Sequence, residues 1–224
     1  MKSSHTPTAG TTTADTPEVQ ACRGRPRGFC RDQALRRAMR LFWAHGYEGV
    51  SVAQLTKELC IAPPSLYAAF GSKEALYREA LDLYLRENAD LFAASLAMVP
   101  ARAGILALLR ELAVRYASGE QPPGCMVVAA GVACAQEQRG VAEDLAARRT
   151  HLLDALAERF EKARAAGELR PDADCRALAR LVVATLQGMS IQARDGATEA
   201  ELLSLVDAAM AGWPEPVGRM EAEP

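Results

Sequence analysis

Two consecutive prolines, Pro63 and Pro64, restrict how this chain can fold more than any other feature of its sequence. Pro64 disfavours helical backbone at Pro63, whereas Pro64 itself fits the first turn of a helix, where an N–H would have no intrahelical acceptor. The residues that follow at helical spacing are Leu66, Tyr67 and Phe70. Gly71 then interrupts the pattern, so the sequence predicts a short, abruptly started helix over residues 64–70.

Two helices are expected before this one, and another directly after it. The first carries the apolar residues Ala34, Leu35, Ala38, Leu41 and Phe42 and is ended by Gly46. Ser51 is positioned to cap the second, whose buried stripe is Val52, Leu55 and Leu59. Ser72 is positioned to cap the fourth, over residues 73–96. A helix followed by two short helices and a tight turn predicts a helix-turn-helix head.

Charge is unevenly distributed along the chain. Residues 1–80 contain 11 Lys/Arg and 7 Asp/Glu, a net charge of +4, whereas residues 81–224 contain 15 and 21, a net charge of −6. A basic head on an acidic body indicates that the head meets a polyanion. Residues 1–20 have no apolar stretch of the kind a signal peptide needs, and no segment reaches 18 apolar residues, so we expect a cytoplasmic protein.

The composition predicts an all-α protein. Half of the 224 residues are hydrophobic and only 5% are aromatic, with Ala and Leu most frequent. After the head, helical patterns separated by Gly- and Pro-containing breaks occur over residues 101–118, 124–137, 140–166, 172–193 and 198–211.

The stretch "ALRRAMRLFWAHGYEGVSVAQLTKELCIAPPSLYAAFGSKEALY" resembles the tetracycline-repressor (TetR) family of bacterial transcription regulators. The matching features are Phe42, Gly46-Tyr47 before Ser51-Val52, Ala53, Leu66-Tyr67-x-x-Phe70 and Ser72-Lys73-Glu74-Ala75-Leu76. The resemblance implies a dimeric, non-enzymatic repressor with an N-terminal DNA-reading head and a C-terminal ligand-binding and dimerisation bundle. The expected division is a disordered tail (1–22), a DNA-binding domain (23–72), a ligand-binding and dimerisation domain (73–212) and a frayed end (213–224).

The chain departs from the family pattern at two places. Cys60 occupies the turn between the second and third helices, where the family usually has Gly, and a non-Gly residue is strained there if its φ is positive. Pro63, Pro64 and Ser65 stand where longer polar side chains are common in the family.

The resemblance makes residues 64–70 the recognition helix in the major groove of DNA. Ser65 can hydrogen-bond a base edge or a phosphate, and Ala68 can touch a thymine methyl group. We expect Tyr67, Lys73 and Ser51 to contact phosphates, and Leu66 and Phe70 to pack inside the head. The predicted DNA-binding residues are therefore Arg23, Arg25, Arg27, Ser51, Pro64, Ser65, Tyr67, Ala68 and Lys73.

The arginines of that set come from the segment "RGRPRG". An extended basic arm of this kind fits the narrow minor groove of A·T-rich DNA. A solvated basic linker is the alternative interpretation.

In the family, the last two helices of each subunit form a four-helix bundle in the dimer, which then binds a palindromic operator. The predicted interface residues are Leu178, Leu181, Val182, Thr185, Leu186, Met189, Leu202, Leu205, Val206 and Ala209. Both apolar stripes could instead pack the core of their own subunit.

The family resemblance also implies a small-molecule inducer bound in the body. Candidate lining residues are Phe92, Leu108, Leu112, Met126, Ala130, Leu152 and Phe160, although each could equally be ordinary core. Since polar groups are few among them, we expect a hydrophobic ligand. No Cys/His spacing is typical of zinc, so we predict no metal and no cofactor.

Cys125 starts the helix expected over residues 124–137, where the helix dipole can make a thiol more reactive. It is either a sensor of oxidants or electrophiles or a small buried hydrophobe. Cys134 is about 13.5 Å further along the same helix, too far for a disulfide. We expect Cys22, Cys30 and Cys175 at exposed or linker positions.

A helical thiol enzyme is the alternative from another functional class. The sequence has none of the common nucleotide-binding, zinc-protease or serine-hydrolase motifs, and its histidines (His5, His45, His151) are scattered. Such an enzyme would need Cys125 to pair with His151. A helical adaptor would leave the basic head unexplained.

Overall fold

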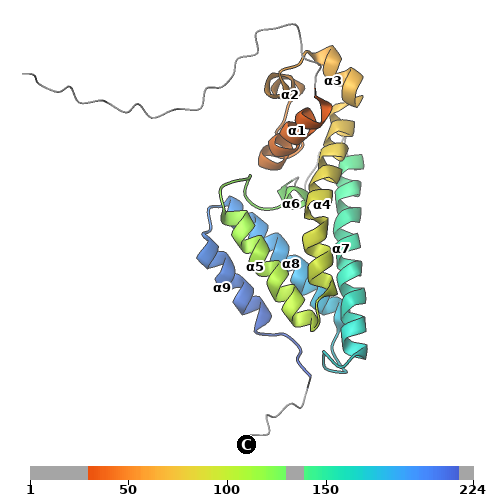
Figure 1. The fold of residues 1–224 in the computed structure, drawn as a ribbon, viewed down its shortest axis with the longest axis vertical. Helices are drawn as coiled ribbons and strands as arrows, with labels where there is room; N and C mark the ends of the chain where they lie inside the picture. Colours follow the sequence, from red (N-terminus) through yellow and green to blue (C-terminus); the bar gives the residue numbers. More distant parts are fainter. Residues whose placement is uncertain (1–29, 130–138, 217–224) are drawn as a thin grey trace, which may run out of the picture.

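The computed structural model describes residues 30–129 and 139–216, and every regular element in these two ranges is a helix. The predicted all-α fold is thereby confirmed. Figure 1 shows a small group of helices at one end of the molecule and a larger bundle below it. None of the described helices combines the length and the apolar character needed to cross a membrane.

The small group, called the head below, consists of α1 (Arg31–His45), α2 (Val52–Leu59) and α3 (Pro63–Phe70). Its inward side chains share one core with the first turns of α4 (Lys73–Ala97), and residues 126, 127, 141 and 145 complete that core. Phe42 and Tyr47 each pack edge-on against Tyr77, with ring centroids 5.1 Å apart. Because buried aromatic rings contribute large apolar areas, this cluster holds the head on α4.

The predicted ends of the head helices are present in the structure. The N–H of Gly46 donates to Phe42 O. The hydroxyl oxygen of Ser51 accepts from the N–H of Gln54, and the side-chain oxygen of Gln54 accepts from the N–H of Ser51. Ser72 caps α4 by accepting from the N–H of Ala75. These caps satisfy N–H groups that have no partner within their own helices.

The long helix α4 runs from the head into the larger bundle beside α7 (Arg139–Ala165) (Figure 1). Near the end of α4, Arg159 of α7 donates to the carbonyl oxygens of Leu96 and Met98, at 2.9 and 2.8 Å. Because the last carbonyls of a helix lack intrahelical donors, this guanidinium fixes the end of α4 against α7.

The larger bundle, called the body below, also contains α5 (Ala101–Ala117), the short α6 (Met126–Ala129), α8 (Cys175–Arg194) and α9 (Glu199–Met210). Helix α8 contacts α5, α7 and α9, and α5 also packs on α4 and α9. A second core fills the space between them and includes Phe160 and Trp213, whose rings meet edge-on at 5.5 Å.

Helix α3 begins one residue earlier than predicted. Ala62 is the extended N-cap, with φ −74° and ψ 151°, and both Pro63 and Pro64 lie in the first turn. The first turn tolerates both prolines because neither position has an intrahelical acceptor for an N–H. The conformational bias that Pro64 places on Pro63 is overcome by the packing of the helix that follows.

One cysteine position differs from its prediction. Cys175 is buried, with 1% of its surface exposed, because it opens α8 directly under the body core. Cys30 is exposed as predicted, and Cys60 is exposed too. Cys22 and Cys134 lie outside the described residues.

Candidate nucleic-acid interface and regulatory junction

The turn between α2 and α3 is built around Cys60 in the left-handed conformation, with φ 54° and ψ 42°. The N–H of Cys60 donates to Lys57 O at 3.3 Å, and that of Ile61 donates to Thr56 O at 3.1 Å. These bonds end α2 and send the chain into α3. Glycine adopts this conformation without steric cost, whereas a residue with a Cβ is strained in it. Cys60 therefore carries the backbone strain that the sequence predicted for this position.

Helix α3 has one buried and one exposed face. Leu66 and Phe70 are buried in the head core. The predicted contact residues Pro64, Ser65, Tyr67 and Ala68 are all exposed, and Tyr67 exposes 48% of its surface. The structure therefore brings these four residues together on the outward side of α3.

Arg31 holds α3 in place, a role that the sequence pattern did not reveal. Its guanidinium lies 4.6 Å from the centre of the Phe70 ring, donates to Ala69 O at 3.2 Å and pairs with Glu79 at 2.7 Å. Since these partners are 38 and 48 residues away in the chain, no local spacing could have indicated them.

The two remaining described candidates for phosphate contact flank α3. Lys73 is half-buried, with its ammonium group 4.2 Å from the centre of the Tyr47 ring. Burial lowers the pKa of Lys73, and the Glu48 carboxylate acts in the opposite direction. Ser51 is exposed, and its hydroxyl hydrogen is available because the oxygen acts as the helix-capping acceptor. Arg23, Arg25 and Arg27 lie outside the described residues.

The C-terminal end of α1 is bonded to the body through Trp43 and Arg194. The indole N–H of Trp43 donates to Gly124 O at 3.0 Å. From the end of α8, Arg194 donates to Trp43 O at 3.1 Å and to Ala44 O at 2.9 Å. These contacts, which we call the head–body junction, connect the head to the body independently of α4.

Gly124 and Cys125 form the body side of the junction. Gly124 has a φ of +75°, and a Cβ added there would lie 2.5 Å from the backbone oxygen of Ser190, so only glycine fits. The next N–H, that of Cys125, donates to the hydroxyl oxygen of Ser190 at 2.8 Å. Helices α1 and α8 therefore meet through this segment.

The Cys125 side chain is partly buried and lies beside the phenols of Tyr84 on α4 and Tyr116 on α5. Burial raises the pKa of both phenols well above the ordinary value, and the neighbouring thiol raises it further. The thiol thus lies where α4, α5 and the junction meet.

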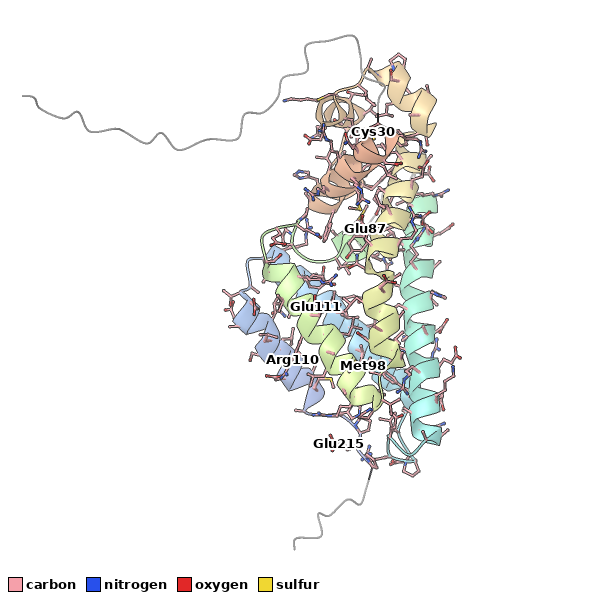
Figure 2. The ribbon with its side chains drawn as sticks, in the orientation of Figure 1. Cys30, Glu87, Met98, Arg110, Glu111 and Glu215 are labelled. Carbon is pink, nitrogen blue, oxygen red and sulfur yellow. The ribbon has the colours of Figure 1, made fainter. Side chains whose placement is uncertain are left out.

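A pocket of about 430 Å³ opens beside these tyrosines. Its lining comes from α1, α4, α5 and the segment after α5: Trp43, Tyr84, Glu87, Asn88, Glu111, Leu112, Val114, Arg115, Tyr116, Ser118, Glu120 and Gln121. Figure 2 labels Glu87 on α4 and Glu111 on α5.

Of the predicted ligand-lining residues, Leu112 lines this pocket. Leu108, Met126 and Phe160 are fully buried in the two cores, and Phe92 and Leu152 pack against the body core. Ala130 lies outside the described residues.

Most of the predicted dimer residues face the core of their own subunit. The buried ones are Leu178, Val182, Thr185, Leu186, Met189, Leu202 and Val206. Leu205 and Ala209 are partly buried, whereas Leu181 exposes 45% of its surface. The side of α8 that is turned outward carries Leu181 together with Ala177, Ala184 and Ile191.

Two family models match the chain. The model for bacterial regulatory proteins of the tetR family matches residues 34–80, and that for the tetracyclin repressor-like C-terminal domain matches residues 102–208. The first match covers most of the head and the start of α4, and the second covers most of the body.

Two proteins of Escherichia coli (strain K12), both named HTH-type transcriptional repressors, are similar over most of their length. ComR is 34% identical over 208 residues, which is 91% of this chain and 98% of ComR. BdcR is 34% identical over 191 residues, which is 84% of this chain and 90% of BdcR.

A solved structure of a cysteine-substituted form of the TetR-family transcriptional regulator CifR, complexed with 26-bp double-strand operator DNA, is also similar. Its sequence identity is 44% and its TM-score 0.81, covering 85% of this chain and 100% of the CifR chain. With both family models matched and a repressor 34% identical along nearly the whole chain, the protein belongs to the TetR family of bacterial regulatory proteins.

Proposed function

We propose that this protein is a dimeric transcriptional repressor that binds a palindromic operator through its head and releases it when a small molecule binds the body. The observation that carries the proposal is the outward face of α3, with Pro64, Ser65, Tyr67 and Ala68 exposed together. The operator complex of the similar CifR supports it. Such a repressor acts in the cytoplasm, where its operator lies.

The face of α3 suits close approach to DNA. Because Ser65 and Ala68 are small and Pro64 carries no N–H, the helix can lie deep in the major groove, where Ser65 and Ala68 reach base edges. Tyr67 extends further and suits a phosphate oxygen. The positive end of α4, with Lys73 beside it, suits another phosphate.

The operator can be identified by selecting bound fragments from random DNA duplexes with the full chain. We expect a palindrome whose half-site centres are about 34–36 Å apart, or a multiple of that distance, and an affinity that falls as salt rises. If no duplex is retained at low ionic strength, the proposal is wrong.

Two substitutions distinguish contacts with DNA phosphates from contacts with base edges. Tyr67→Phe removes one hydroxyl and keeps the ring, so we expect about 2- to 10-fold weaker binding for all sequences alike. Ser65→Ala is expected to change the preference at one operator position. Ser204→Ala, at an exposed serine of α9, is the matched control and should leave binding unchanged.

The arginines at 23, 25 and 27 are proposed to form a minor-groove arm. Replacing all three by Ala should reduce the slope of log affinity against log salt by about 2.7, since each neutralised phosphate contributes about 0.9. An unchanged slope would reject the arm in favour of a solvated linker.

Dimerisation is proposed to use the outward face of α8. The residues on this face follow one another at intervals of four and three positions along the helix, as in the contact face of a coiled coil. They are Ala177, Leu181, Ala184, Gly188 and Ile191. Leu181 and Ile191 expose 45% and 52% of their surfaces, and the three small residues allow a partner helix to approach closely.

A charge placed on this face tests the dimer. Leu181→Glu should produce a monomer in sedimentation at micromolar concentration, because the carboxylate would be buried against the partner. Val99→Glu, at a valine that exposes 76% of its surface, is the control and should remain dimeric. A dimer that survives Leu181→Glu would place the interface elsewhere.

A second candidate function is redox or electrophile sensing through Cys125. It is favoured by the position of the thiol, which lies beside Tyr84 and Tyr116, and by the position of Cys125 directly after Gly124 of the head–body junction. A group added to sulfur in this packed position would displace the junction and shift the head between conformations.

N-ethylmaleimide treatment tests sensing by Cys125. We expect the untreated chain to bind operator, the alkylated chain to lose affinity, and the Cys125→Ser variant to retain affinity after treatment. Cys60→Ser controls for the exposed thiol of the head. Equal sensitivity of the Cys125→Ser variant would reject the idea.

A thiol enzyme gains no support. His151 is exposed on α7, whereas the Cys125 thiol is partly buried beside Tyr84 and Tyr116.

A further inference from the structure

We propose that the 430 Å³ pocket between α1, α4 and α5 binds an amphipathic cation, a flat apolar body that carries an ammonium or amine group. The inference rests on the proposed function, because it names the chemical class of the ligand and the route by which that ligand reaches the head. It refines the hydrophobic inducer predicted from the sequence.

The floor of the pocket is aromatic and apolar. Trp43, Tyr84, Leu112 and Tyr116 line it while exposing no more than 6% of their surfaces, and the Trp43 and Tyr84 rings meet edge-on at 4.9 Å. A volume of about 430 Å³ is within the range of small-molecule sites. Electron-rich aromatic rings of this kind also attract cations.

The rim of the pocket is acidic. Glu87, Glu111 and Glu120 are opposed on the lining by Arg115, so the formal charge of the lining is −2. Figure 2 labels Glu87 on α4 and Glu111 on α5, two of the helices that line the pocket. An anionic ligand would be repelled by this charge, whereas a cation would be attracted.

The rim carboxylates can exchange their present partners at small cost. Glu87 pairs with Arg36, and Glu111 pairs with Arg115 at 2.7 Å, all with exposed side chains. Exposed ion pairs of this kind contribute little to stability, so a ligand ammonium can replace one of the arginines. Within the described ranges, Glu120 has no ion-pair partner and can accept a cation directly.

The pocket touches both halves of the molecule. Trp43 belongs to the head, and the same residue donates to Gly124 O and accepts from Arg194 at the head–body junction. Tyr116 belongs to the body core, and Tyr84 lies on α4 in the core that the head shares with α4. A ligand packed against Trp43 therefore contacts head and body at once. It will stabilise the position of the head, relative to the body, in which these contacts are best.

Intrinsic fluorescence gives a direct test, because the chain has two tryptophans and only Trp43 lines the pocket. In the Trp213→Phe variant, the remaining emission reports on Trp43. We would titrate this variant with benzyltrimethylammonium, neutral N-benzylacetamide and anionic phenylacetate, which are of similar size. We expect the cation to change the emission saturably and to bind at least tenfold tighter than the neutral probe, and phenylacetate to have no effect.

Substitutions of the carboxylates that line the pocket test whether the cation binds there. Glu111→Gln should weaken the cation several-fold without affecting the neutral probe, and Glu215→Gln, an exposed carboxylate far from the pocket (Figure 2), should change neither. Three results would overturn the proposal. They are equal binding of all three probes, no change of emission with any probe, and a Glu111→Gln variant that binds the cation as tightly as the unchanged chain. If Trp213→Phe loses its helical circular dichroism, saturation-transfer NMR on the unchanged chain measures the same affinities.

A second measurement tests the link to DNA. We expect saturating cation to lower operator affinity in the unchanged chain and to do so several-fold less in Glu111→Gln at the same concentration. A cation that binds without altering operator affinity would overturn its regulatory role. A chain that binds the cation but no operator would instead contradict the proposed function, so the two failures are distinguishable.

Discussion

Cys60 adopts a backbone conformation that most residues avoid. Its φ of 54° and ψ of 42° place it in the left-handed region, where the Cβ of an L-residue costs about 1–2 kcal/mol. The thiol is exposed and donates only long contacts, at 3.7 Å to Lys57 O and 4.0 Å to Glu58 O. The side chain therefore offsets little of the cost of its backbone.

Replacing this cysteine with glycine should stabilise the protein. For Cys60→Gly we expect the free energy of unfolding to rise by about 0.5–1 kcal/mol in urea, since glycine relieves the strain but adds entropy to the unfolded chain. Cys60→Ala removes the thiol and keeps the strain, so it should be neutral within about 0.5 kcal/mol. Equal effects of both substitutions would mean that the thiol, not the backbone, matters.

A glycine can be required by its backbone conformation alone, as at Gly167, or also by a close neighbour, as at Gly124. Both have a positive φ, +75° and +76°, but a Cβ at Gly124 would meet Ser190 at 2.5 Å, whereas one at Gly167 would meet nothing within 4 Å. We expect Gly167→Ala to cost about 1 kcal/mol from backbone strain and Gly124→Ala to cost clearly more. Urea unfolding of both variants measures the difference, and equal losses would contradict the clash.

At the scale of elements, α4 and α5 meet at two buried phenols, Tyr84 and Tyr116, which lie beside the Cys125 thiol. Burial raises the pKa of Tyr84 and Tyr116, so both remain protonated in the folded protein at pH values where they ionise in the unfolded chain. Their contribution to stability is complete below the ordinary tyrosine pKa of about 10 and is lost as pH rises through the raised values.

The free energy of unfolding should therefore fall above about pH 10, by up to about 1.4 kcal/mol per pH unit for each phenol. In Tyr84→Phe, which removes one of them, the fall should be shallower. Tyr67→Phe, at an exposed tyrosine of α3, is the control and should follow the unchanged chain. Urea unfolding between pH 9 and pH 11 gives the slopes, and identical slopes for all three would refute the assignment.

At the scale of the whole molecule, the head is attached to the body by packing and by hydrogen bonds. Helix α4, α6 and the start of α7 share the core of the head, and the head–body junction adds bonds between residues as far apart in sequence as Arg194 and Trp43. The Arg194 guanidinium binds two carbonyls at the end of α1, so α8 contacts the head directly and not only through α4.

Removing the guanidinium should loosen the end of α1 selectively. In Arg194→Met we expect amide hydrogens that follow Trp43 to exchange several-fold faster, because the end of α1 loses its cap, while α9 keeps its rates. Hydrogen exchange with mass spectrometry resolves the two regions. Arg180→Met, at another exposed arginine of α8, is the control, and a change of equal size there would contradict the junction.

The sequence by itself determined the head and its caps. Ser51, Ser72, Gly46 and Gly71 act on backbone groups within a few residues of themselves, so their effects can be predicted from neighbouring letters. The same holds for the burial of Leu66 and Phe70 and the exposure of Tyr67 and Ala68. Periodicity sufficed there because α3 has a single apolar stripe.

Only the tertiary structure decided which face of α8 turns inward and what lines the pocket. Helix α8 carries apolar residues on two faces, so periodicity could not distinguish buried Val182 and Met189 from exposed Leu181 and Ile191. Trp43 meets Gly124 across 81 residues and Arg194 across 151. Contacts of this range depend on how finished helices pack against one another, and no local interaction along the chain specifies that packing.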